Sequence, residues 1–107
     1  MMVTTSATIA GHRVVQTLGL VRGNTIRARH LGRDILAGLK ALIGGEIEEY
    51  TKMLAEAREQ SIDRMGEEAR RLGGNAITDV RFSSSYLMGG AAEILVFGTA
   101  VRIEPES

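Results

Sequence analysis

The stretch EIEEYTKMLAEAREQSIDRMGEEARRLGG, residues 46–74, decides the fold class of this chain. Apolar and small residues recur in it at spacings of three and four, which places them on one face of an α-helix. Acidic residues fill the first turn, Arg70 and Arg71 fill the last, and Gly73-Gly74 supplies a stop, so we predict a helix over residues 46–72. At about 1.5 Å per residue this helix is roughly 40 Å long, more than the width of a compact chain of this size. We therefore expect it to protrude or to span a larger assembly.

The residues before this helix combine a second helical pattern with a strand pattern. Residues 31–43 carry an apolar stripe and few charges, which predicts a shorter helix that needs cover on more than one side. Residues 11–28 fit either a hairpin turning at Gly23-Asn24 or one long strand with glycines at bulges, and the pattern leaves both open. Residues 3–10 fit a short extra strand and turn.

The residues after the long helix have the pattern of two strands. Residues 75–86 and 92–104 are separated by a short segment in which Gly89-Gly90 predicts a hairpin. Both alternating sets of the last strand are largely apolar, so we expect it to be covered on both faces. The order strand, helix, helix, strand, strand predicts one α+β domain over residues 1–107, with an antiparallel three-stranded sheet and two helices.

Composition places the chain among globular proteins and favours self-association. Of its 107 residues 44% are apolar, one is Pro, and 13 basic residues balance 13 acidic ones, which excludes membrane, collagen-like and disordered classes. Only two Tyr and two Phe are present, so a monomer has a thinly filled core. The start, MMVTTS, lacks the charged and apolar segments of a signal peptide, so we expect a cytoplasmic protein without a membrane partner.

Charge is unevenly distributed along the chain. Residues 1–45 hold six basic residues and one acidic residue, whereas residues 46–107 hold seven basic and twelve acidic residues. The two halves can neutralise each other within one subunit or between subunits. No aromatic residue accompanies the basic cluster, so we do not expect nucleic acid as a partner. That cluster consists of Arg22, Arg27, Arg29 and Arg33.

Candidate metal ligands are few and are all histidine or carboxylate, because the chain has no cysteine. His30 and Asp34 lie four residues apart at the start of the shorter predicted helix and can share a face. Asp79 and Glu93 are each a single acid on an otherwise apolar or neutral strand, and they either face each other or pair with an arginine across the hairpin. Zinc normally needs three or four donors, so a divalent-metal site requires ligands from elsewhere in the fold or from another subunit.

Motifs for catalysis are missing from the sequence, so we expect a protein that is not an enzyme. It contains neither a GxSxG nor an SxxK spacing, and its glycines do not form a dinucleotide or phosphate loop. Tyr50 and Arg58 are the candidates for a small-ligand site, since a phenol and a guanidinium two helical turns apart can bind an anion. The alternative is that both pack against a neighbouring element.

The whole chain resembles the YbjQ-like family, small bacterial and archaeal proteins labelled heavy-metal-binding. No single motif carries this resemblance, but their order and spacing together are specific. The chain departs from the family pattern at Thr51, where the family often has Glu. The matching residues are Val3-Thr4-Thr5, Gly19-Leu20-Val21-Arg22-Gly23, Arg33-Asp34, Ile43-Gly44-Gly45, Tyr50, Ala57-Arg58-Glu59, Met65 with Ala69, Leu72-Gly73-Gly74-Asn75-Ala76-Ile77 and Gly98-Thr99-Ala100-Val101.

The resemblance implies an antiparallel sheet of long strands with two helices on one side, assembled as a ring-shaped homopentamer. It also favours a single long first strand over the hairpin. The first functional hypothesis is a non-enzymatic homo-oligomer that binds a metal ion or small ligand between subunits. The alternative is a scaffold ring that presents the helix over residues 46–72 to a protein partner.

Overall fold

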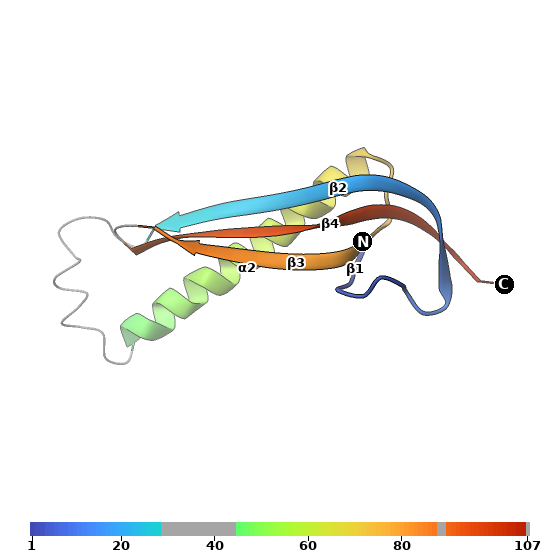
Figure 1. Cartoon of the computed structure of the whole chain (residues 1–107). Coiled ribbons are helices and arrows are strands. Elements are labelled where there is room, and N and C mark those ends of the chain that lie inside the picture. Colours follow the sequence, from blue (N-terminus) through green and yellow to red (C-terminus); the bar gives the residue numbers. More distant parts are fainter. Residues whose placement is uncertain (29–44, 88–89, 107) are drawn as a thin grey trace.

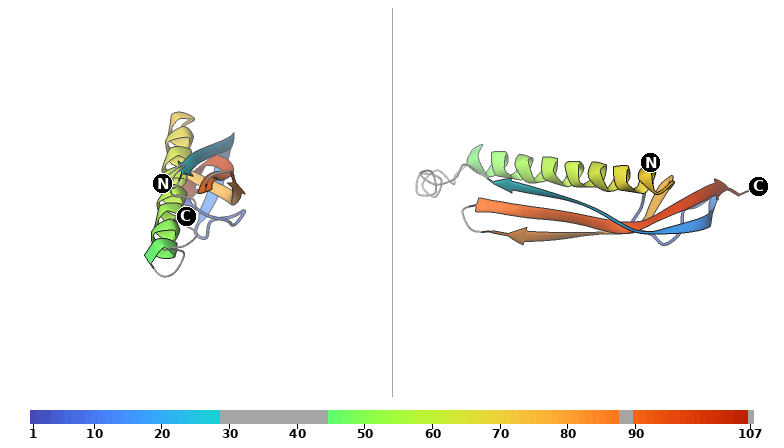
Figure 2. Two further views of the ribbon diagram at one scale, coloured as in Figure 1. Left: turned by 90° about the vertical axis from the view of Figure 1, so that its left-hand side faces the viewer. Right: turned by 90° about the horizontal axis from the view of Figure 1, so that it is seen from above.

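The computed structural model describes residues 1–28, 45–87 and 90–106. One helix and four strands lie in these ranges (Figure 1). The strands form a single sheet in the order β1-β3-β4-β2, and α2 lies against one face of it, so the domain is α+β (Figure 2). The elements are β1 (Met2–Val3), β2 (His12–Ala28), α2 (Gly45–Arg71), β3 (Ala76–Tyr86) and β4 (Ala91–Pro105).

The sheet is mixed, which corrects the prediction of three antiparallel strands. β2 and β3 both pair antiparallel with β4, but β1 pairs parallel with the start of β3. A strand of two residues has no periodicity to detect, so β1 appeared in the sequence only as part of the extra strand and turn expected over residues 3–10. The described part also holds one helix instead of the predicted two, because the residues predicted as the second helix, 31–43, lie outside it.

The segment before the helix is one long strand and does not turn at Gly23-Asn24. β2 is 17 residues long and pairs with β4 along its whole length, with bulges between Val14 and Gln16 and between Thr17 and Gly19. Gly19 has a φ of 124°, a conformation that suits a bulge glycine. The glycine at the second bulge thus agrees with the long-strand alternative.

Gly23 is not a turn or bulge residue; its missing side chain lets the backbone of α2 come close to β2. A Cβ atom at this position would lie 2.6 Å from the Met65 backbone nitrogen and closer still to the Ser61 carbonyl oxygen. The residues of α2 that face the sheet here are mostly small and fully buried. We call this contact the seam; it consists of Gly23, Ala57, Ser61, Met65 and Ala69.

A buried hydroxyl pair lies within the seam. The Ser61 Oγ is 2.8 Å from the Thr25 Oγ1, 2.9 Å from the Ala57 carbonyl oxygen and 3.2 Å from the Ile94 carbonyl oxygen. Ser61 and Thr25 are both buried, and each hydroxyl has a hydrogen-bond partner. This satisfied pair links α2 to β2 and to β4 without an unpaired polar group in the core.

The helix ends one residue before the predicted position, in a Schellman motif. The Gly74 amide donates to the Ala69 carbonyl at 2.8 Å, and the Gly73 amide donates to the Arg70 carbonyl at 2.9 Å. Gly73 has a φ of 90°, which side chains rarely tolerate. Asn75 then fastens the chain to β4, since its side chain accepts from the Ile103 amide and donates to the Ile103 carbonyl.

The sheet is covered differently on its two faces. On the helix side, a core of buried residues that includes Val21, Met65, Ile77 and Val96 lies between α2 and the sheet. On the other side, the segment between β1 and β2 covers the end of the sheet near the C-terminus, where Ile9 packs on a second small cluster of Ala76, Val101 and Ile103 (Figure 2). The rest of that face has no cover from the described part of the chain.

The domain is long and thin. Its principal extents are 59 × 22 × 16 Å, and its radius of gyration is 17.6 Å, against about 13 Å for a compact chain of this length. Its accessible surface of 7074 Å² also exceeds the roughly 5,800 Å² typical of a folded monomer of this mass. A single copy therefore leaves more surface exposed than a compact domain does.

Candidate functional site

The uncovered part of the sheet, on the side away from α2, is the first candidate site. β2 contributes Leu20 and Ile26, whose side chains are 65% and 60% exposed, and β4 contributes the half-buried Phe97. Cross-strand pairs place all these residues on one face, opposite buried residues such as Val21 and Val96. We call this the open sheet face, and it consists of Leu20, Arg22, Asn24, Ile26, Arg81, Ser83, Ser85, Glu93, Leu95 and Phe97.

An aromatic ring between two guanidinium groups lies at the centre of the open sheet face. Phe97 pairs with Arg22 on one side and with Arg81 on the other. Directly opposite residues in a sheet have Cβ atoms about 5 Å apart, so both arginines are neighbours of the ring. The Arg81 side chain also donates to the Thr5 carbonyl at 3.0 Å, which ties the N-terminal segment to β3.

A second exposed apolar surface lies on the helix side of the sheet, beside α2. The helix runs mainly over β2 and β4, so β3 projects beyond it. Phe82 and Tyr86 share this side of β3 because they pair with the buried Val96 and Ala92, and their side chains are 47% and 71% exposed. We call this pair the aromatic shoulder. All three aromatic side chains that the structure describes therefore lie outside the buried core.

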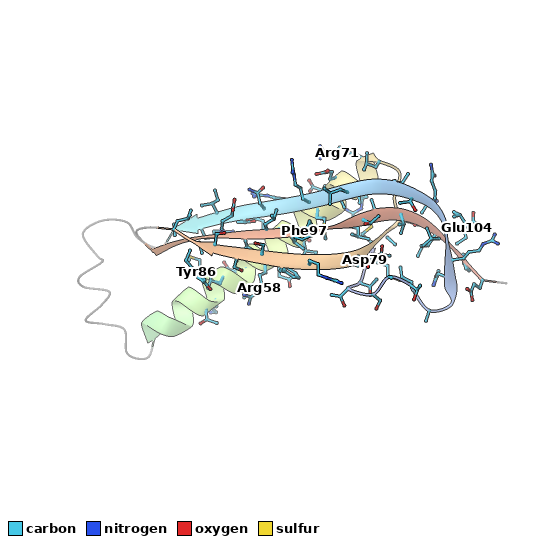
Figure 3. The ribbon with its side chains drawn as sticks, viewed as in Figure 1. Arg58, Arg71, Asp79, Tyr86, Phe97 and Glu104 are labelled. Atoms are coloured by element: carbon cyan, nitrogen blue, oxygen red, sulfur yellow. The ribbon has the colours of Figure 1, made fainter. Side chains whose placement is uncertain are left out.

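The candidate small-ligand residues lie on α2. Arg58 is exposed on the same side of the sheet as Tyr86, as Figure 3 shows. Tyr50 belongs to the first turns of α2, but its side chain lies outside the described part of the structure. Their joint role as a ligand site remains a prediction.

The candidate metal ligands do not converge within one chain. His30 and Asp34 lie outside the described residues. Asp79 lies in β3 opposite Gly98, whereas Glu93 pairs with Ser85, five residues along β4, or roughly 16 Å away. The two carboxylates therefore do not face each other.

The described residues do not fit a soft heavy-metal ion. Thiolate, the preferred ligand of such ions, is absent from the sequence. Among the side chains that the structure describes, those of residues 1–27, 51–87 and 90–106, there is no group of three His, Cys, Asp or Glu that a metal ion could join. The described histidine, His12, lies with its Nδ1 3.0 Å from the Ala10 carbonyl oxygen, which is a local contact.

Asp79 occupies a bulge that the sequence did not reveal. Its φ of 55° is left-handed, and two residues of β3, Asp79 and Val80, oppose Gly98 alone. A Cβ atom on Gly98 would lie 2.9 Å from the Thr78 carbonyl oxygen, so the glycine makes room for the bulge. The Asp79 amide donates to the Ser6 carbonyl at 3.0 Å. The position of this carboxylate is thus set by the N-terminal segment and by a glycine on the neighbouring strand.

The basic cluster predicted from the sequence does not form one surface. Arg22 belongs to the open sheet face, whereas Arg27 lies on the other side, where it donates to the Gln60 side chain of α2 at 2.5 Å. Arg29 and Arg33 lie outside the described residues. The residues that sequence reasoning missed are Arg81, Phe82 and Phe97, since their grouping depends on strand register.

A shallow groove lies between β1 and the second half of α2. Its volume is about 340 Å³, and its walls combine apolar and charged side chains. The charged groups are exposed at its rim, so it is a surface feature and not an enclosed pocket. The lining residues are Met1, Val3, Ile62, Asp63, Gly66, Glu67 and Arg70.

The helix in the described part of the chain is not apolar enough to cross a membrane.

Comparisons with known proteins place the chain among small proteins of the same length. A family model described as "Putative heavy-metal-binding" matches residues 1–104. A UPF0145 protein of Thermus thermophilus is 58% identical over 104 residues, which cover 97% of this chain and 91% of the relative. A UPF0145 protein of Dehalococcoides mccartyi is 56% identical, covering 97% and 100%, and one of Methanosarcina acetivorans is 54% identical, covering 96% and 97%.

A solved structure has the same fold at low sequence identity. It is a protein of unknown function from Pediococcus pentosaceus, assigned to the DUF74 family. The TM-score is 0.62 at 16% identity, and the match covers 97% of this chain and 98% of that one. This likeness supports the arrangement of the elements described above.

Proposed function

This chain belongs to the YbjQ family, and we propose that it is a non-enzymatic, cytoplasmic homo-oligomer that binds a small ligand or divalent cation between its subunits. The observation that carries the proposal is the location of the aromatic side chains. Phe82, Tyr86 and Phe97 all lie outside the core, on two separate surfaces of one thin subunit. Aromatic residues are enriched at the buried centres of protein interfaces. A ring of five copies is the assembly that we propose.

The shape of the subunit supports self-association in a second way. A small domain needs to bury a large part of its surface to be stable, and this one exposes about a fifth more than a compact monomer of its mass. Leu20 and Ile26 on the open sheet face and Val14 and Val15 near the start of β2 are exposed aliphatic residues. Contacts between copies would remove such residues from water, which stabilises an assembly by roughly 25 cal/mol per Å².

The positions of the candidate metal-binding residues support a binding site between copies and not within one copy. Asp79 and Glu93 stand far apart in one chain, so they cannot bind one ion together within a subunit. Rotational symmetry would bring several copies of one such residue around an axis, where weak single ligands act together. The carboxylate and imidazole donors suit a hard or borderline divalent cation better than a soft one. The proposed ligand residues remain His30, Asp34, Asp79 and Glu93 for a metal ion, and Tyr50 and Arg58 for a small anion.

The second candidate function is a scaffold that presents α2 to a protein partner. The observation in its favour is that the outward face of α2 is charged and exposed over residues 56–67. This function requires that face to stay free in the assembled state.

Native mass spectrometry of protein purified without metal-affinity steps or chelators tests the proposed function. We expect an assembly of about 58 kDa, five times the 11.5 kDa chain, with additional mass that chelation or mild denaturation removes. A bare ring that also takes up no added Zn²⁺ or Mn²⁺ would overturn the ligand-binding part and favour the scaffold. A monomer at all concentrations would overturn the whole proposal.

A further inference from the structure

Between residues 56 and 67 the outward face of α2 carries four acidic side chains and no basic one, and the exposed Lys52 and Arg70 lie in line with them beyond the two ends of the run. Counting about 100° per residue, all four lie within about 60° of the direction opposite the buried Ser61. Each of these side chains is exposed. We call this run the acidic stripe, and it consists of Glu56, Glu59, Asp63 and Glu67.

The open sheet face has the complementary charge. Arg22 and Arg81 flank Phe97 at its centre, and both are exposed. Glu93 is the one acidic residue on that face, and it lies four residues along β4 from Phe97. The open sheet face and the acidic stripe lie on opposite sides of the two-layer domain (Figure 2).

Apolar surface accompanies charge on both sides of the domain. The open sheet face exposes Leu20 and Ile26 around Phe97, and the aromatic shoulder of Phe82 and Tyr86 lies next to α2 on the other side. Each side therefore combines charged and apolar side chains. The acidic stripe is opposite in sign to Arg22 and Arg81, and Arg58 is an exposed basic residue on the side of the acidic stripe.

We propose that the open sheet face of one copy docks on the helix side of a second copy. In this contact Arg22 and Arg81 lie against the acidic stripe, and Phe97 with its aliphatic neighbours lies against the aromatic shoulder. This inference rests on the proposed self-assembly and names the two surfaces that meet. It also uses part of the charge difference between the two halves of the sequence, since Arg22 of the basic half then lies against acids of the other half in a second subunit.

Such a contact repeats from copy to copy, because it joins two different surfaces. Each copy donates its open sheet face and receives another on its helix side, which is a heterologous contact. The rotation between neighbours then either closes a ring or extends a filament. A contact between two open sheet faces would instead stop at a dimer and would bring like charges together.

Charge reversal tests the proposal, with sedimentation velocity as the measurement. We expect Arg22→Glu, and separately Glu59→Arg with Asp63→Arg, to raise the dissociation constant by at least about 100-fold, because each places like charges opposite one another. A chain that carries all three substitutions restores opposite charges and should assemble again. Arg22 is the decisive arginine, since Arg81 also holds the N-terminal segment through Thr5.

The control is Arg13→Glu, which reverses another exposed charge near the other end of β2 and at the same time breaks the exposed ion pair of Arg13 with Glu104 at 3.2 Å. It should assemble as the unmodified protein does, and circular dichroism should show that every variant keeps its helix. Mixing the sheet variant with the helix variant should restore contacts between unlike copies, but a ring of five cannot alternate completely and keeps at least one contact between like charges, so the mixture should assemble less well than the triple variant.

The outcomes separate this inference from the proposed function. If the unmodified protein assembles but the reversed variants assemble equally well, the acidic stripe and the open sheet face do not meet. If Arg22→Glu prevents assembly and the triple variant does not regain it, the open sheet face meets another surface, which also overturns the inference. If the unmodified protein is a monomer throughout, the proposed self-assembly itself fails.

Discussion

Replacing Gly23 by alanine should destabilise the domain by about 3 kcal/mol, since it inserts a methyl group between two backbones. The new Cβ atom would lie 2.6 Å from the Met65 nitrogen and 3.0 Å from the Arg64 Cβ. Restoring ordinary contact distances requires α2 to move away from β2 by about 1 Å. That movement lengthens the 2.8 Å hydrogen bond between Ser61 and Thr25 beyond its useful range, which costs about 1 kcal/mol. Looser packing of Met65 and its neighbours accounts for about 2 kcal/mol more.

Urea unfolding followed by circular dichroism at the helix band measures this change. Gly66→Ala is the matched control, because it adds the same methyl group inside α2, where the nearest atom is the Arg70 Nη1 at 3.9 Å. Removing a glycine from a helix interior should stabilise it by about 0.5–1 kcal/mol. Both variants are compared at equal protein concentration, since the stability of an assembly depends on concentration. If Gly23→Ala unfolds within about 0.5 kcal/mol of the unmodified protein, backbone contact does not set the distance between helix and sheet.

Three further substitutions probe the other connections of the fold. Asn75→Ala removes both hydrogen bonds to the Ile103 backbone and should lower the free energy of unfolding by about 1–2 kcal/mol. Hydrogen exchange at the Ile103 amide should become faster, and unchanged exchange there would contradict the role given to Asn75. Ser61→Ala leaves the buried Thr25 hydroxyl without its partner and should lower the free energy of unfolding in urea by about 1–2 kcal/mol. Adding Thr25→Val should recover part of this loss. If the effects of the two substitutions on the free energy of unfolding simply add, the two hydroxyls are not coupled. Gly73→Ala forces a side chain into a φ of 90° and should lower stability by about 1 kcal/mol, which thermal unfolding can detect; no change would mean that the helix end relaxes freely.

The long helix and long strands could be predicted from the sequence because local pattern determines them. The predicted helix over residues 46–72 agrees with Gly45–Arg71, and the glycine pair after it forms the expected stop. The hairpin of β3 and β4 is confirmed by their antiparallel pairing. One apolar set of β4 lies under α2, whereas part of the other set lies on the open sheet face, so the cover expected on both faces of this strand stays a prediction.

Features that depend on contacts distant in sequence could not be predicted. β1 is a strand only because β3 lies beside it, and the Asp79 bulge exists because Gly98 leaves room for it and the N-terminal segment bonds to its amides. Bulges shift the register between strands, so the separation of Asp79 from Glu93 could not be predicted from the sequence either. For the same reason the grouping of Arg22, Phe97 and Arg81, far apart in the sequence, has no local signal.

The seam has a consequence for how this domain can change during evolution. Because a strand glycine touches the helix backbone, main-chain atoms fix the spacing between the two layers, and three of the four helix positions of the seam, all except Met65, hold only Ala or Ser. Larger side chains at these three positions would force the layers apart, so this part of the interior has little capacity for growth. New bulk can be added only on the outer surfaces. Variation in side-chain size should therefore alter which surfaces adhere, while the interior of the domain stays nearly constant.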